Sequence, residues 1–223
     1  MTSSASPPNL RGAAGVVPAN SSAQTVLANL PHFAEWGGGA WHGFLKDALE
    51  HFIGSDLSGQ RVLDIGARYG RTASMFALLG AHVTAVDTDP ACIVRARAET
   101  ARWGVAERVE LLQSTGELDI VPDDSFDLVF TKSVLIIVPR LEHFLEQVRA
   151  KLRANGKIVF IENARGLLPF HLLRLLKRET RARWSRTRYF ARPEFAALRR
   201  IFRDVEIRTS FYPPVALVTG YKP

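Results

Sequence analysis

Short β-type runs and helical stripes alternate along the middle of this chain, and the alternation limits the folds open to it. The β-type runs predict five strands, at Arg61–Ile65, His82–Val86, Val109–Leu112, Phe126–Phe130 and Lys157–Ile161. Between them, apolar residues at helical spacing predict helices at Thr72–Leu79, Pro90–Trp103 and Leu141–Leu152. Because a helical crossover joins parallel strands, the pattern indicates an α/β fold with a doubly wound, Rossmann-like sheet.

The alternation ends after the fifth run. A helix is predicted from Pro193, and two further strands are predicted at Val205–Phe211 and Val215–Tyr221. The proline-containing turn between these two strands is too short for a helical crossover, so they should pair antiparallel. We therefore expect a mostly parallel seven-stranded sheet with a C-terminal antiparallel pair and a lid insertion after strand five, at about residues 165–192.

The length of 223 residues suits one domain. Residues 1–24 are rich in Ser, Ala, Pro, Gly and Asn, so we expect a flexible tail there and the domain at 25–223. The tail lacks the pattern of a secretory signal, and its one arginine is too few for a transit peptide. No run approaches eighteen apolar residues, and the single cysteine, Cys92, suits a reducing compartment. We expect a cytoplasmic protein.

The most specific motif is VLDIGARYG at Val62–Gly70, between the first strand and the first helix of the alternation. Gly66 lets the backbone approach a ligand there, and the helix N-terminus presents unpaired N–H groups. Asp87 closes the second strand, where a carboxylate accepts hydrogen bonds from both hydroxyls of an adenosine ribose. With Asp64 before the glycine, the motif resembles that of the class I S-adenosylmethionine-dependent methyltransferases, over about residues 61–163. The fingerprint G-x-G-x-x-G is not found, which disfavours a nicotinamide-dependent oxidoreductase.

The resemblance implies S-adenosyl-L-methionine as the cofactor. The cofactor-binding residues that it implies are Asp64, Gly66, Ala67, Arg68, Gly70, Asp87, Thr88, Thr115, Gly116 and Thr131. Asp89 either lies beside the adenine or caps the helix that begins at Pro90. Two residues depart from the family pattern: Arg68 stands where a middle glycine is usual, and Thr115 replaces an acid. The Arg68 side chain would either obstruct the loop or bind the cofactor carboxylate.

These features favour methylation of a small molecule. Methyl transfer depends mainly on positioning the acceptor, and a general base helps when the acceptor is a hydroxyl. The candidate bases are His42, Lys132, Glu162 and His171, although His42 is better interpreted as a polar position on an amphipathic helix. No histidine spacing predicts a metal site, and no G-x-S-x-G elbow predicts a hydrolase.

Positive charge is concentrated near the C-terminus. The net charge of the chain is +7, whereas residues 165–203 alone contribute +10, from twelve basic and two acidic residues. Within them, Leu167–Arg178 combines leucines with a stripe of His171, Arg174 and Arg178. This segment fits a cap helix on the sheet, or a surface for an anionic or lipid-like acceptor. We prefer the cap helix to a peripheral contact with an anionic membrane through residues 167–188.

Two alternatives of other classes stay open. Arginines at 181, 183, 186 and 188 alternate with Trp184 and Tyr189, a mixture that grips phosphates and stacks bases, so a methyltransferase acting on RNA is the second choice of substrate. The other alternative is a non-catalytic binding or interaction protein that keeps the fold but has lost turnover. The departures from the family pattern at Arg68 and Thr115 are the reason for this alternative.

Overall fold

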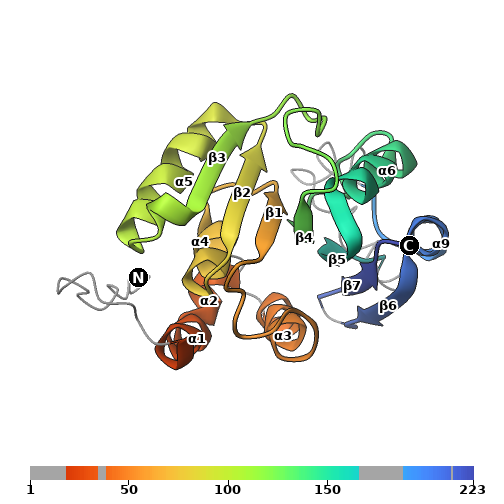
Figure 1. The fold of residues 1–223 in the computed structure, drawn as a ribbon. Coiled ribbons are helices and arrows are strands. Elements are labelled where there is room, and N and C mark those ends of the chain that lie inside the picture. Colours follow the sequence, from red (N-terminus) through yellow and green to blue (C-terminus); the bar gives the residue numbers. More distant parts are fainter. Residues whose placement is uncertain (1–18, 35–38, 166–187, 212) are drawn as a thin grey trace, which may run out of the picture.

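The computed structural model describes residues 19–34, 39–165, 188–211 and 213–223. A seven-stranded sheet runs through the molecule in the order β3-β2-β1-β4-β5-β7-β6 (Figure 1). The strands are β1 (Arg61–Ile65), β2 (His82–Asp87), β3 (Val109–Gln113), β4 (Phe126–Lys132), β5 (Leu152–Asn163), β6 (Arg203–Thr209) and β7 (Val215–Tyr221). β1 to β5 pair in parallel, whereas β7 pairs antiparallel with both β5 and β6. The predicted fold class is confirmed.

Helices cover both faces of this sheet, as Figure 1 shows. They are α1 (Ala19–Ala28), α2 (Leu30–Ala34), α3 (Gly39–Ala48), α4 (Arg71–Leu78), α5 (Pro90–Arg102), α6 (Leu141–Lys151) and α9 (Arg192–Ile201). A π-helical turn, Leu49–Ile53, continues α3, and a 3₁₀ turn, Ala106–Arg108, precedes β3. α1 to α4 pack on one face with α5 beside α4, and α6 and α9 pack on the other.

The central strands supply both hydrophobic cores because neighbouring residues of a strand point to opposite faces. Val62 of β1 and Phe130 of β4 enter the core under α1 to α4. Leu63 and Val129, their neighbours in sequence, enter the core under α6 and α9. Burial on both faces explains why these strands read as continuous apolar runs rather than as alternating ones.

The domain begins earlier than its sequence indicates. α1 begins at Ala19, inside the stretch 1–24 that we expected to be a tail, and Val26 and Leu30 are buried against the sheet-covering helices. The helix thus starts before the expected boundary at residue 24, while residues 1–18 lie outside the described residues, and the division into a tail and a domain stays a prediction. Most of the expected lid insertion, residues 166–187, also lies outside them. Within the described ranges, no helix is long and apolar enough to cross a membrane.

Candidate functional site

A cavity of about 680 Å³ opens at the carboxyl ends of β1, β2 and β4, where open α/β sheets bind ligands. Seven of the ten expected cofactor-binding residues line it: Asp64, Gly66, Ala67, Arg68, Asp87, Thr88 and Gly116. Its volume lies within the range of about 300–1,000 Å³ that is usual for small-molecule and cofactor sites. The structure thus gathers residues from three separate loops around one space.

The two glycines of the VLDIGARYG motif meet different constraints. Gly66 has φ +72°, and a Cβ there would lie 2.3 Å from Cγ2 of Val134 in the segment after β4. Gly70 caps α4 with φ +74°, and a Cβ there would lie 2.9 Å from the Cα of Ala96 in α5. Gly66 therefore shapes the cavity wall, whereas Gly70 is needed for the packing of α4 on α5 and does not line the cavity.

Arg68 adopts a conformation in which glycine is usual. Its φ is +50°, a left-handed backbone that costs a non-glycine residue about 1–2 kcal/mol. Its backbone N–H donates to Oδ2 of Asp87 over 2.8 Å, and its guanidinium lies over the ring of Tyr69, 4.6 Å from the centroid. The loop thus keeps a glycine-like backbone with an arginine in place, and Arg68 lines the cavity instead of blocking it.

Asp87 ends β2 at the edge of the cavity. Its Oδ2 accepts from the Arg68 N–H, and its Oδ1 accepts from the Asp89 N–H over 3.0 Å. Each carboxylate oxygen has two lone pairs, so both can still accept from a ribose hydroxyl. Asp89 caps α5 by accepting from the Ala91 N–H over 2.8 Å, which settles its capping role. Burial and the carboxylates of Asp87 and Asp89 raise the pKa of the nearby Cys92 thiol above its usual value.

The loop after β3 contributes different residues from those expected. Thr115 is exposed and does not line the cavity, whereas Ser114 is buried and lines it together with Gly116. The Ser114 hydroxyl accepts from the Gly116 N–H over 2.9 Å and donates to the Glu117 carbonyl over 2.7 Å. These bonds fix a tight turn in which the side chain one position earlier than predicted faces the cavity.

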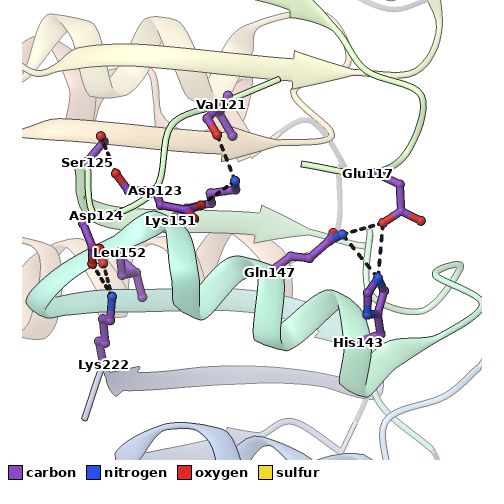
Figure 2. A network of polar contacts seen from close by, with 10 residues as sticks. All are labelled: Glu117, Val121, Asp123, Asp124, Ser125, His143, Gln147, Lys151, Leu152 and Lys222. Atoms are coloured by element: carbon purple, nitrogen blue, oxygen red, sulfur yellow. Dashed lines mark hydrogen bonds and ion pairs between the residues drawn. The ribbon is translucent and has the colours of Figure 1, made fainter. Parts of the chain in front are cut away.

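Polar contacts with α6 hold this loop in place, as Figure 2 shows. The Glu117 carboxylate accepts from Nε2 of Gln147 over 2.6 Å and lies 3.6 Å from Nε2 of His143. Further along, the buried Lys151 donates to the Val121 carbonyl over 2.9 Å and to Asp123 over 2.7 Å. The loop between β3 and β4 is therefore tied at both ends to one helix.

The four candidate bases are not brought together. Lys132 lines the cavity, and its Nζ donates to the Ala34 carbonyl at the end of α2 over 2.6 Å. Glu162 is fully buried and accepts from the Thr131 hydroxyl over 3.0 Å. Neither Glu162 nor Thr131 lines the cavity. His42 lies on α3 outside the lining, and His171 lies outside the described residues.

Burial in the core raises the pKa of Glu162 to about 7, although hydrogen bonds from Leu135, Thr131 and Val134 act in the opposite direction. Its Oε1 accepts all three bonds, and its Oε2 has no hydrogen-bond partner among the described residues. The geometry fits an anchor for backbone groups better than a base in contact with a ligand.

An apolar wall that the motif analysis did not include forms a further part of the cavity lining. Its residues come directly after β4 and from α3 and α6: Val134, Ile136, Ile137, Val138, Pro139, Trp41 and Phe144. The sequence does carry a signal for this wall, the apolar run that continues past the end of β4. Asn163 and Tyr189 also line the cavity. The described residues hold no group of three or more His, Cys, Asp or Glu side chains arranged to bind a metal.

The fold and the site define a class of protein: a doubly wound sheet with a glycine turn after β1 and an acid, Asp87, at the end of β2. Residues 63–160 match the model of the family described as "Methyltransferase domain". The match identifies this part of the chain as a methyltransferase domain and confirms the resemblance of its sequence to the class I S-adenosylmethionine-dependent methyltransferases. The cofactor of this domain is S-adenosyl-L-methionine.

Curated proteins with the same domain match about half of the chain. The mitochondrial ubiquinone biosynthesis O-methyltransferase of Schizosaccharomyces pombe is 35% identical over 113 residues, which are 50% of this chain and 41% of that protein. The demethylmenaquinone methyltransferase of Tropheryma whipplei is 31% identical over 121 residues, 53% of this chain and 49% of that protein. The chain therefore matches less than half the length of these relatives.

A solved structure with this fold is geranyl diphosphate C-methyltransferase from Streptomyces coelicolor, crystallised with S-adenosyl-L-homocysteine. It has a TM-score of 0.65 at 11% identity and covers 82% of this chain and 77% of that one. The likeness concerns the fold.

The residues of the cavity fit the cofactor. Gly66 lines the cavity and leaves room for the Val134 side chain in its wall, and the Asp87 carboxylate keeps lone pairs for hydroxyl groups. Gly66 and Asp87 would hold the methionine part and the ribose, and Ser114 and Gly116 would lie beside the adenine. The methyl group would then face the residues that follow β4.

Proposed function

We propose that this chain methylates a small, lipid-like acceptor with S-adenosyl-L-methionine as the methyl donor. The observation that carries the proposal is that one cavity is lined both by the glycine turn and Asp87 and by an apolar wall that includes Ile136, Val138 and Phe144. Contact with such a wall adds little to the binding of charged or strongly hydrated acceptors. Apolar rings and chains bind more favourably with every apolar group that the wall buries.

The printed names of two relatives support the same class of acceptor. One is named for ubiquinone biosynthesis and the other for demethylmenaquinone, and both names refer to ring compounds that carry apolar chains. We infer from these names a reduced quinone or a similar ring as the kind of acceptor to test first.

Positioning supplies most of the acceleration in this proposal. When bound, the cofactor would supply a methyl group activated by its sulfonium. The acceptor atom would bond to this carbon in line with the carbon–sulfur bond, which breaks and leaves S-adenosyl-L-homocysteine, and the proton of the acceptor would pass to solvent. The apolar wall excludes water and orients the acceptor ring, so that the two reactants meet in one geometry. Lys132 is the candidate base that reaches the cavity, and its Nζ donates to the Ala34 carbonyl; we therefore assign it to holding α2 over the site.

The test is methyl transfer by the purified chain to demethylmenaquinol in detergent micelles, with the methylated product detected by mass spectrometry. We expect product from the wild-type chain and none from Gly66→Val, whose side chain collides with Val134. Glu107→Gln, an exposed position in the 3₁₀ turn before β3, is the matched control and should behave as the wild type.

Other outcomes identify the alternatives. Product formed on total RNA but not on the quinol would favour the RNA methyltransferase. Arginines 181, 183 and 186, which suggested that alternative, lie outside the described residues, and the guanidinium of Arg188 donates to backbone carbonyls of the chain itself. Binding of the cofactor without transfer to any acceptor would favour the non-catalytic interaction protein.

A further inference from the structure

The apolar wall of the cavity is formed by a segment without regular secondary structure, Ser133–Arg140, between β4 and α6. Such a segment has no ladder of its own to fix its backbone, and its N–H and C=O groups need other partners. We propose that Glu162 and Arg188 are paired positioning residues that clamp this segment from its two ends. Neither residue lines the cavity, so neither is a catalytic residue.

Glu162 holds the first part of the segment through its N–H groups. Its Oε1 accepts from the Val134 N–H over 3.2 Å and from the Leu135 N–H over 3.1 Å. The Thr131 hydroxyl, at the end of β4, donates to the same oxygen. Since the carboxyl group is fully buried, these bonds are shielded from competing water. The carboxyl thus gathers consecutive backbone donors at the point where β4 ends.

Arg188 holds the second part of the segment through its carbonyl groups. Its guanidinium donates to the Val138 carbonyl over 3.0 Å and to the Pro139 carbonyl over 3.2 Å. Its backbone N–H donates to the Ile136 carbonyl over 2.7 Å. An arginine suits this task because its planar fork presents several donors in a fixed geometry.

The position of Arg188 is itself fixed by the sheet. Phe190, two residues later, exchanges backbone hydrogen bonds with the end of β5: its N–H donates to the Asn163 carbonyl, and its carbonyl accepts from the Arg165 N–H. Glu162 precedes Asn163 in β5. Both halves of the clamp therefore originate at the same strand end. They hold the segment through opposite hydrogen-bonding roles: Glu162 accepts from N–H groups, and Arg188 donates to carbonyls.

The clamped segment has contacts that transmit its position to the whole cavity. Val134 packs against Gly66 of the glycine turn, and Ser133 has φ +58°, a conformation that needs support from its surroundings. The Ser133 N–H donates to the Ile161 carbonyl over 2.9 Å, which supplies that support. Release of the Glu162 end would therefore disturb the glycine turn as well as the apolar wall, whereas release of the Arg188 end would disturb the apolar wall alone.

Hydrogen exchange measured by mass spectrometry on the full chain tests the clamp. In Glu162→Ala and in Arg188→Met, amides in the peptide that spans residues 133–140 should exchange about 10- to 100-fold faster, the effect of losing buried hydrogen bonds. Glu162→Gln keeps an acceptor oxygen and should restore protection. Arg188→Lys should not, because one ammonium does not reproduce the fork. Arg199→Met, exposed on α9, is the control and should leave the peptide unchanged.

Calorimetry with S-adenosyl-L-homocysteine supplies the second readout. Arg188→Met should bind it as the wild type does, and Glu162→Ala should bind it more weakly, because Val134, at the Glu162 end of the segment, packs against the glycine turn. Unchanged exchange at 133–140 in both variants would overturn the clamp, as would a rise spread equally over β1 and β2. Arg188 is half-buried, so Arg188→Met keeps the test decisive even if Glu162→Ala fails to fold. Exchange needs no acceptor and no turnover, so the clamp and the proposed function can fail separately.

Discussion

Glu162 should make the stability of this protein depend on pH in a way that a single substitution removes. The pKa of its carboxyl rises from 4.5 to about 7 in the folded chain because of burial. Between these values the folded protein holds a proton that the unfolded chain has released. The contribution of Glu162 to stability is therefore fully present below pH 4.5 and is lost as the pH rises through about 7.

The two pKa values set the size of the effect. One pKa unit corresponds to about 1.4 kcal/mol, so the free energy of unfolding should fall by about 2 to 3 kcal/mol between pH 5 and pH 8 through this group alone. Glu162→Gln is neutral throughout, and its Oε1 can accept the bonds from Val134, Leu135 and Thr131. Its Nε2 would be an unpaired donor at every pH, which shifts its stability by a constant amount.

The assay is urea unfolding of the wild type and of Glu162→Gln at several pH values from 5 to 8. Other titrating groups are common to both proteins, so the difference between the two free energies isolates Glu162. The free energy of unfolding of the wild type minus that of Glu162→Gln should fall by about 2 to 3 kcal/mol from pH 5 to pH 8. Raising the pH thus destabilises the wild type relative to Glu162→Gln. Glu107→Gln, at an exposed position, should parallel the wild type. Parallel curves for the wild type and Glu162→Gln would refute the reasoning.

Three further substitutions test the glycine turn and Asp87. Asp87→Ala should weaken S-adenosyl-L-methionine binding by about 10- to 100-fold in calorimetry, because it removes charge-assisted bonds, and normal affinity would exclude Asp87 from the site. Gly66→Ala should lose binding of S-adenosyl-L-methionine. Adding Val134→Ala should restore part of the binding, because it removes the 2.3 Å collision but not the strain at φ +72°. No recovery would mean that another contact limits the loop. Arg68→Gly should raise stability by about 1 kcal/mol in thermal unfolding, since glycine adopts φ +50° without strain, whereas a loss of stability in Arg68→Gly would contradict the backbone explanation.

The sheet and the polar part of the site are predictable from the sequence because their signals are local. Strand and helix periodicities lie within single elements, and the glycine turn and Asp87 have fixed places at the ends of β1 and β2. Thr115 shows the limit of such reasoning. The end of β3 is predictable to within one residue, but the turn after it directs Ser114 rather than Thr115 into the cavity, and a shift of one residue reverses the side that a side chain faces.

The remaining parts depend on contacts between residues that are distant in the sequence. The hydrogen bonds of Glu162 to Val134 and of Arg188 to Val138 span 28 and 50 residues. The residues around Glu162 and Arg188 do not indicate which backbone groups these side chains bind. An acid at the end of β5 is equally compatible with the role of a base, a helix cap or an anchor for backbone groups. The start of α1 escapes prediction for a similar reason, since burial of Val26 under the fold stabilises a helix in a stretch whose composition suggests a tail.

A common principle of construction follows from these contacts. Three loops surround the cavity, and each is fixed by a carboxylate that accepts backbone or amide N–H donors: Asp87 for the turn after β1, Glu117 for the loop after β3, and Glu162 for the segment after β4. Only Asp87 among these faces the cavity and keeps lone pairs for a ligand. Substitutions that impair the site should therefore include positions that touch no ligand. A scan limited to the lining would miss Glu117 and Glu162, although the loops that they hold supply nine of the 24 residues that line the cavity.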